Sequence, residues 1–281
     1  MIIYRKIAAL KANLEILRET VKLGFVPTMG ALHDGHLQLL RKAREENAFT
    51  ILSIFVNPVQ FNDPGDFKKY PVTLEEDIEK LLREGCDILF LPHQDEMYPQ
   101  GLKPVESLDL GLLDTVLEGS SRPGHFQGVC RVVDLLLSIV EPAQLYMGQK
   151  DYQQCMVISR LLKITGRSTQ LVICDTEREW DGLAMSSRNM RLTEEQRKIA
   201  PEIYQLLQYF EKNLTSGNLS YMKDYGYATL NEKGFRVDYI AFVNAESLKN
   251  ISSWDGKEAV VALIAAFIDD IRLIDNKVLA S

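Results

Sequence analysis

The sequence predicts an α/β protein in two parts, a parallel β-sheet covered by helices on both faces and a smaller α+β domain. Apolar runs alternate with amphipathic stretches over the first ~175 residues, which is typical of strand–helix units that build a parallel sheet. The pattern changes after Asp181, where helices precede a pair of strands. We therefore place the boundary so that the domains cover residues 1–176 and 177–281.

The elements of the first domain follow from hydrophobic periodicity. Strands are predicted over residues 24–26, 50–56, 88–91, 145–147 and 171–174. Helices are predicted over residues 7–20, 35–46, 74–84, 129–140 and 152–165. Ligands of such sheets bind outside the carboxyl ends of the strands, so the segments that follow the strands are where we look for a site.

The second domain begins with a long amphipathic pattern over residues 192–214, which predicts one continuous helix. Thr193 precedes Glu194 and Glu195 and is a candidate N-cap. A helix over residues 221–233 and strands over residues 237–243 and 259–268 complete the predicted α+β domain.

Composition narrows the class of protein. The 281 residues are 46% hydrophobic and 25% charged with a net charge of −7, as in an ordinary soluble protein. No basic stripe is present, so we expect no nucleic-acid partner. The four cysteines form no Cys-x-x-Cys pair, and the first residues hold no apolar signal core. Since the longest apolar run is also far shorter than the ~20 residues of a membrane span, we expect a cytoplasmic protein without a membrane partner.

The run Pro27-Thr-Met-Gly-Ala-Leu-His-Asp-Gly-His36 is the most informative motif. His33 and His36 share one face at the start of a helix that follows a predicted strand, and Gly30 and Gly35 allow close approach of a ligand. A helix N-terminus attracts anions through its unpaired N–H groups and its dipole. Together with two imidazoles, this predicts a phosphate that reacts. A metal pair and simple helix capping are the alternatives, although no ligand set for a metal is completed nearby.

Two further motifs add positive charge. Lys150, in Gly148-Gln149-Lys150-Asp151, lies at a predicted helix start, where the dipole disfavours a lysine unless an anion offsets it. The alternative is an ordinary surface lysine. Met185-Ser186-Ser187-Arg188 places two hydroxyls and a guanidinium in a loop, which suits a phosphate clamp but is a short pattern.

Amide side chains follow two of the strands. Asn57 and Gln60 come after the second predicted strand, and Gln154 lies one turn beyond Lys150. Amides both donate and accept hydrogen bonds, so they suit a neutral or carboxylate substrate. His125 lies in Arg122-Pro-Gly-His-Phe-Gln-Gly128, which is predicted to be a loop and is equally consistent with an ordinary turn.

An acidic cluster, Glu75-Glu76-Asp77, lies at the start of a predicted helix. A favourable interaction with the helix dipole is the simpler interpretation, and magnesium binding is the more specific one.

Together these motifs resemble the pantothenate synthetase (pantoate–β-alanine ligase) family, within the nucleotidyltransferases that carry a His-x-Gly-His turn. The resemblance extends from Pro27 to the run Arg272-Leu-Ile-Asp-Asn276. It implies a Rossmann-like catalytic domain, a C-terminal lid domain and a homodimer. It also implies ATP-dependent condensation of pantoate with β-alanine through a pantoyl adenylate, releasing AMP and pyrophosphate, with Mg²⁺ on the phosphates.

The resemblance also implies roles for residues. His33, His36 and Lys150 are expected to be catalytic, and His36 is the better candidate for proton donor. Asn57, Gln60 and Gln154 are expected to bind substrate. The residues that bind the metal are not assigned, and Glu76 and Asp77 are candidates. The residues expected to bind ATP are Met29, Gly30, Ala31, Leu32, His33, Asp34, Gly35, His36, Gly148, Gln149, Lys150, Asp151, Glu177, Met185, Ser186, Ser187 and Arg188.

The chain departs from the family pattern in two places. Asp175-Thr-Glu-Arg-Glu-Trp180 replaces a mostly apolar run near the backbone expected to meet adenosine, and Arg131 and Leu135 replace the usual Thr and Lys. Two other readings stay open. One is an adenylyltransferase that acts on a different acceptor, and the other is a nucleotide-binding relative without activity. If AMP is released only when the amine is present, the protein is the ligase and neither of these two alternatives.

Overall fold

The computed structural model describes residues 1–18, 20–62, 64–102 and 106–280 and separates into two compact units. The first comprises Met1–Gly148 and Gln153–Asp175, and the second comprises Gln149–Tyr152 and the chain from Thr176 onward. The domain limits 1–176 and 177–281 stay a prediction, and the short segment Gln149–Tyr152 groups with the second unit. Among the described residues, no helix is long and apolar enough to cross a membrane.

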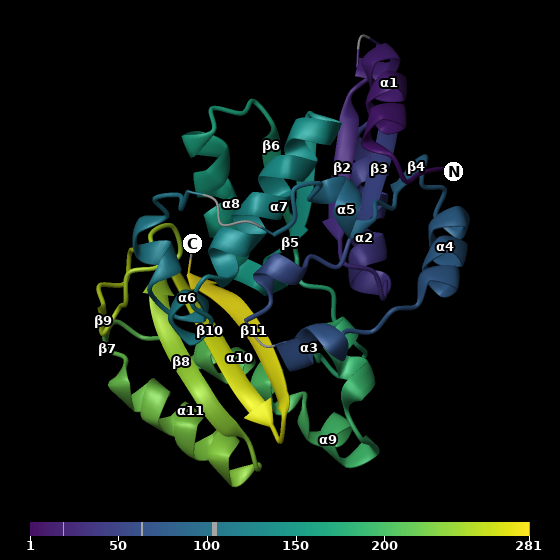
Figure 1. The fold of residues 1–281 in the computed structure, drawn as a ribbon. Coiled ribbons are helices and arrows are strands. Elements are labelled where there is room, and N and C mark those ends of the chain that lie inside the picture. The colour runs from purple at the N-terminus through teal and green to yellow at the C-terminus, as the bar shows by residue number, and fades with distance from the viewer. Residues whose placement is uncertain (19, 63, 103–105, 281) are drawn as a thin grey trace. The chain divides into compact units, whose positions relative to one another are not determined.

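A six-stranded sheet forms the centre of the first unit, counted over the described residues, and its strand order is β1-β4-β3-β2-β5-β6 (Figure 1). Every pairing in it is parallel, which confirms the α/β prediction. The strands are β1 (Ile2–Tyr4), β2 (Leu23–Thr28), β3 (Phe49–Ile54), β4 (Ile88–Phe90), β5 (Gln144–Gly148) and β6 (Gln170–Cys174). Sequence analysis missed β1 because it is a three-residue edge strand without a periodic pattern.

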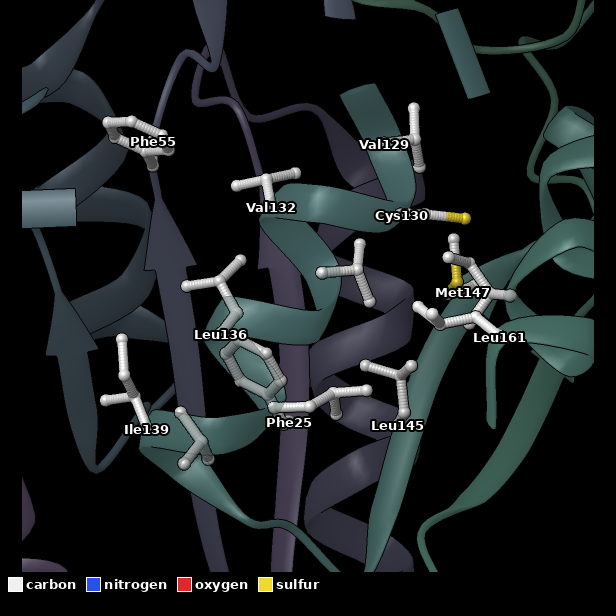
Figure 2. Close-up of a cluster of buried hydrophobic side chains, with 14 of the residues drawn as sticks. Phe25, Phe55, Val129, Cys130, Val132, Leu136, Ile139, Leu145, Met147 and Leu161 are labelled. Carbon is white, nitrogen blue, oxygen red and sulfur yellow. The ribbon is translucent and has the colours of Figure 1, made fainter. Parts of the chain in front are cut away.

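Helices cover both faces of this sheet, because neighbouring residues of each strand point to opposite sides. Phe25 packs in the cluster formed with α1, α7 and α8, while Val26 packs with α2 and α4 on the other face. Figure 2 shows the first cluster, which includes Val132 and Leu136 of α7 together with Phe25 of β2. The helices are α1 (Ile7–Arg18), α2 (Asp34–Glu46), α4 (Leu74–Arg83), α7 (His125–Val140) and α8 (Tyr152–Ile164).

Short helical segments join these elements. They are η1 (Pro58–Gln60), α3 (Pro64–Lys68), α5 (Gln94–Met97), η2 (Gly111–Asp114), α6 (Glu118–Ser121) and η3 (Gln149–Asp151). Residue 19, at the end of the predicted helix 7–20, lies outside the described residues.

The strand order fixes where a ligand is expected. The chain passes from β2 to β3 on one side, while β5 lies against the other side of β2. In open α/β sheets the ligand site lies at this reversal, outside the carboxyl ends of the strands. The segment after β2 carries His33 and His36, and the segment after β5 begins with Gln149 and Lys150.

The second unit contains an antiparallel sheet in the order β11-β10-β8, with α10 and α11 packed against it (Figure 1). Its core includes Phe210, Phe242 and Ile264. The elements are η4 (Ser187–Arg191), α9 (Glu194–Ile199), α10 (Glu202–Asn213), β7 (Gly217–Asn218), α11 (Ser220–Glu232), β8 (Arg236–Asn244), β9 (Ser253–Trp254), β10 (Val260–Ile268) and β11 (Ile271–Ala280).

Two helix predictions are corrected. The single helix over residues 192–214 is wrong, because it divides into α9 and α10 at Pro201, which lacks the N–H that a continuous helix needs. The Thr193 cap is confirmed: its hydroxyl accepts the Gln196 N–H, and the Gln196 side chain accepts the Thr193 N–H. The other correction concerns α7, which begins at His125, so the predicted histidine loop is the first turn of a helix.

Gly128 lets α7 lie against η1, and this contact supports a testable prediction. A Cβ at residue 128 would lie 2.5 Å from the Val59 carbonyl oxygen and 2.8 Å from the Gln60 Cα. We expect Gly128→Ala to lower the free energy of unfolding by about 1–3 kcal/mol, the usual cost of overpacking against a backbone that must move.

Denaturant unfolding measures this change, with Ser138→Ala on the same helix as the control, since the bond of Ser138 among the described residues is a local one to the Leu135 carbonyl. Equal stability of Gly128→Ala and the control would contradict the close packing of α7 on η1.

Candidate functional site

The turn that joins β2 to α2 has an unusual backbone. Gly30 has φ +83° and Ala31 has φ +50°, so both occupy the left-handed region, which side chains other than glycine rarely adopt. A Cβ at Gly30 would lie 3.0 Å from Ile54 and 3.1 Å from the Asp77 carboxylate. The turn therefore needs glycine at residue 30 and an external restraint at residue 31.

Asp77 supplies that restraint from α4. Its Oδ2 accepts the Ala31 N–H at 2.9 Å, and its Oδ1 accepts the Leu32 N–H at 2.8 Å. Thr73 donates its hydroxyl to the same carboxylate at 3.1 Å, and Lys80 donates to the Leu32 carbonyl at 2.7 Å. The Asp77 side chain is buried, so these bonds are shielded from water. One helix thus fixes both sides of the turn.

This arrangement corrects two expectations. The N–H groups at the start of the turn do not await a ligand, because Gly30, Ala31, Leu32 and His33 all donate within the chain. Asp77 has a structural role instead of the expected magnesium role, because its carboxylate is 1% exposed and accepts two backbone N–H groups and the Thr73 hydroxyl. No group of three or more metal-binding side chains occurs in the part of the chain that the structure describes. Glu76 is exposed one residue earlier.

The two histidines lie together at the N-terminus of α2. Their ring centroids are 4.1 Å apart, and both side chains are half-buried. The backbone N–H of His33, which is the N-cap of α2, donates to Nδ1 of His36 at 3.4 Å. A ring nitrogen that accepts a hydrogen bond carries no proton, so the neutral His36 ring has its proton on Nε2. Nε2 is therefore the ring nitrogen of neutral His36 that acts as a hydrogen-bond donor.

Gln60 and Asn57 are brought together with Met29. Gln60 donates to the Met29 sulfur at 3.1 Å, and Asn57 donates to the Gln60 side-chain oxygen at 3.2 Å. Asn57 is 1% exposed, and its own oxygen accepts the Tyr98 hydroxyl at 2.8 Å. Burial raises the pKa of Tyr98 to about 12, so this hydroxyl keeps its proton at neutral pH. Asn57 therefore orients the Gln60 amide.

His125 contacts the backbone of Gln60, and it lies at the start of α7 instead of in the predicted loop. From the first turn of α7, its Nδ1 lies 2.7 Å from the Gln60 carbonyl oxygen, and its Nε2 lies 3.1 Å from Arg122 Nη1. A carbonyl only accepts and a guanidinium only donates, so the ring is neutral with its proton on Nδ1. The histidine joins Arg122 to the backbone of Gln60.

The substituted residues on α7 are also accounted for. Arg131 lies over the Tyr98 ring at 4.8 Å in a cation–π contact, and Leu135 packs against the core. Both substituted side chains therefore have packing partners within the first unit.

Two consecutive glutamines on α8 have different surroundings. Gln153 is buried and donates to the Leu113 and Val116 carbonyls at 2.8 and 2.9 Å, so its amide holds a loop. Gln154 is half-buried, and its amide makes no hydrogen bond within the described chain. Of the two, Gln154 is the one whose amide is not committed to a hydrogen bond within the described residues.

The second unit carries the cationic residues. Lys150 lies in η3 with its side chain 19% exposed, and its ammonium lies 3.3 Å from the Asp151 carboxylate. Asn276 of β11 donates to the Gln149 and Lys150 carbonyls, both at 2.9 Å. Sequence analysis gave Asn276 no role, although it lies in the run that ends the family resemblance.

The segment Met185–Arg188 follows a tight hairpin in the same unit. The Met185 N–H donates to the Glu177 carbonyl at 3.0 Å, which closes the hairpin and uses backbone that was expected to meet adenosine. Ser186 caps η4, because its hydroxyl accepts the Arg188 N–H at 3.3 Å. Ser187 is buried, and Arg188 lies one residue further on.

Comparisons with known proteins agree with these features. The family model of pantoate–β-alanine ligase matches residues 2–278. Pantothenate synthetases of Cytophaga hutchinsonii and Marinomonas sp. are each 43% identical, covering 99% and 97% of both chains.

Solved structures also match over nearly the full length of the chain. Pantothenate synthetase from Thermus thermophilus has a TM-score of 0.90 at 39% identity, covering 100% of both chains. The pantoate–β-alanine ligase of Francisella tularensis, solved in complex with β,γ-ATP and β-alanine, has a TM-score of 0.83 at 39% identity over 99% of this chain and 98% of its own. A restrained histidine turn and these full-length matches lead to one conclusion: this chain belongs to the pantoate–β-alanine ligase family.

Proposed function

We propose that this protein uses ATP to condense pantoate with β-alanine, giving pantothenate, AMP and pyrophosphate. The observation that carries the proposal is the family match over residues 2–278, and the retained His33–His36 turn supports it. The reaction has a simple chemical logic. A carboxylate is a poor acylating agent, and adenylation gives its carbonyl carbon a good leaving group.

In the first step, a carboxylate oxygen of pantoate attacks the α-phosphorus of ATP and the bond to the β-phosphate oxygen breaks. Negative charge builds on the α-phosphate as pyrophosphate leaves. The Nε2–H of His36 suits the task of donating to that phosphate, because the turn fixes its ring in the required tautomer. His33, 4.1 Å away between ring centroids, is assigned to the same phosphate.

The remaining charge of ATP falls to the cationic segments of the second unit. Lys150, Ser186, Ser187 and Arg188 are proposed to hold the triphosphate, because ammonium, hydroxyl and guanidinium groups all donate to phosphate oxygens. The rest of ATP is assigned to Met29–Gly35 through side chains and the remaining backbone groups, and to Gly148–Asp151, Glu177 and Met185. Mg²⁺ carried on the phosphates supplies further neutralisation of charge.

Pantoate is assigned to the amide side chains of the first unit. Gln60 and Gln154 are proposed to hydrogen-bond it, and Gln60 also suits β-alanine. Asn57 acts through Gln60, since its own amide is committed to Gln60, Tyr98 and the Gly128 carbonyl. In the second step the amine of β-alanine attacks the activated carbonyl carbon, the bond between that carbon and the AMP oxygen breaks, and the amine nitrogen releases one proton to water.

The setting of the enzyme is also part of the proposal. The four cysteines are buried thiols, which suits the reducing cytoplasm. A homodimer is proposed from the family resemblance.

The proposed reaction predicts which products need which substrates. We expect AMP and pantothenate to form only when ATP, pantoate and β-alanine are all present, because the amine releases AMP from the adenylate. Chromatography of nucleotides with mass spectrometry of pantothenate measures this. Pyrophosphate and a stable nucleotide product without any amine requirement would indicate an adenylyltransferase for another acceptor. No turnover at all would indicate a relative without activity.

The tautomer of His36 predicts a graded effect of substitution. His36→Ala should lower kcat by about 10²-fold or more, the usual loss for a positioned donor to a transition state. His36→Gln should recover part of this loss, because the glutamine Nε2 can donate from a similar position. Steady-state kinetics of both variants check this, and a glutamine variant as inactive as the alanine variant would count against donation from Nε2.

A further inference from the structure

The run Arg272–Asn276 on β11 contains two buried polar side chains that the proposed mechanism does not use. Asp275 is 4% exposed and Asn276 is 1% exposed, in a strand at the edge of the second unit's sheet (Figure 1). Buried polar groups cost free energy unless they are hydrogen-bonded, so their partners indicate what they do.

Asn276 uses its whole amide on one turn. Its Nδ2 donates to both the Gln149 and the Lys150 carbonyls at 2.9 Å, and its Oδ1 accepts from the Gln149 side chain at 3.3 Å. The turn η3, which receives these contacts, follows directly on β5. Asn276 therefore fixes the backbone from which the Lys150 side chain extends, without touching the ammonium itself.

Asp275 faces a different segment. It pairs with Arg178 through two bonds of 2.6 and 3.0 Å, and it also accepts the Asn276 N–H at 2.8 Å. Arg178 donates to the Gly182 carbonyl at 3.0 Å and lies over the Tyr204 ring at 3.9 Å. Burial raises the pKa of the Asp275 carboxyl, and the Arg178 guanidinium opposes that rise. Asp275 thus holds the hairpin that leads into Ser186.

The two cationic segments have β11 as a common support. Both η3, which carries Lys150, and η4, which carries Ser187 and Arg188, pack against this strand. Adjacent residues of β11 therefore anchor the two segments, because Asn276 bonds to the first and Asp275 bonds to the hairpin before the second. A shift of β11 would move both together.

We infer that Asn276 and Asp275 are positioning residues. They hold Lys150 and the Ser186–Arg188 segment at the positions from which both bind the triphosphate of ATP. The inference rests on the proposed function and assigns these residues to ATP alone. Neither residue is placed in contact with substrate. Their effect passes through the backbone of η3 and through Arg178.

The test measures KM for each substrate in Asn276→Asp and Asn276→Ala. The aspartate variant keeps the shape of the side chain but places a carboxylate oxygen, which cannot donate, against the Gln149 and Lys150 carbonyl oxygens. The alanine variant removes the amide. Each should raise KM for ATP about tenfold or more, the scale of losing hydrogen bonds to buried groups. KM for pantoate and for β-alanine should stay within about twofold, because those substrates are bound elsewhere.

A double variant tests whether Asn276 acts through Lys150. When Asn276→Ala is combined with Lys150→Ala, KM for ATP should rise no further than with Lys150→Ala alone, since one interaction cannot be lost twice. Asp238→Asn is the matched control. It removes the charge of Asp238 on β8, which pairs with Arg272 on β11 through bonds of 2.8 and 3.1 Å. Neither residue of this pair bonds to η3 among the contacts described, so KM for ATP in the control should equal that of the unmodified protein.

The outcomes separate the inference from the proposed function. An inactive unmodified protein overturns the function, and with it the inference. If the unmodified protein is active, an unchanged KM for ATP in a folded Asn276 variant overturns the inference alone. The inference is also overturned if KM rises equally for all three substrates. It is overturned as well if the effects of Asn276→Ala and Lys150→Ala on KM for ATP add up in the double variant. If the aspartate variant does not fold, the KM values of the alanine variant decide. If neither variant folds, Asn276 is required for folding and the positioning role is overturned.

Discussion

The carboxylate of Asp77 is the contact on which the first unit's part of the site depends. Ala31 occupies the left-handed region at a cost of about 1–2 kcal/mol for a residue with a Cβ. Hydrogen bonds to a charged acceptor stabilise by about 1.5–3 kcal/mol each, and Asp77 accepts two from this turn. The restraint therefore outweighs the strain, and the turn is held in a conformation that it would not keep alone.

The restraint by Asp77 affects the protonation of the His36 ring through the backbone N–H of His33. With the turn fixed, the N–H of His33 donates to Nδ1 of His36, so the proton of the neutral ring lies on Nε2. The second unit follows a related plan. Asn276 binds the carbonyls of η3 as Asp77 binds the N–H groups of the histidine turn. In both units a buried side chain from a distant part of the sequence satisfies backbone groups of the segment that carries the reactive side chains.

The sequence predicted most of what depends on local pattern. The alternation of apolar runs indicated the parallel sheet, and the glycines, histidines and lysine singled out in the sequence do follow β2 and β5. Predictions that depended on long-range contacts were harder. Asp77 resembles any acidic residue at a helix start, and only the fold shows that its carboxylate meets residues 31 and 32. Pro201 was a local signal that was overlooked, whereas β11 was missed because Asp275, Asn276 and Lys277 interrupt its apolar pattern.

The protonation of the His36 ring tests this account most directly. Nitrogen-15 spectra of the imidazoles distinguish the two tautomers, and His36→Gln assigns the signal among the four histidines. The account predicts a ring protonated on Nε2 in the unmodified protein, and a mixture of tautomers in Asp77→Asn, where the turn loses its charged acceptor. A ring protonated on Nδ1, or a tautomer unchanged by Asp77→Asn, would contradict the claim that Asp77 sets the chemistry of His36.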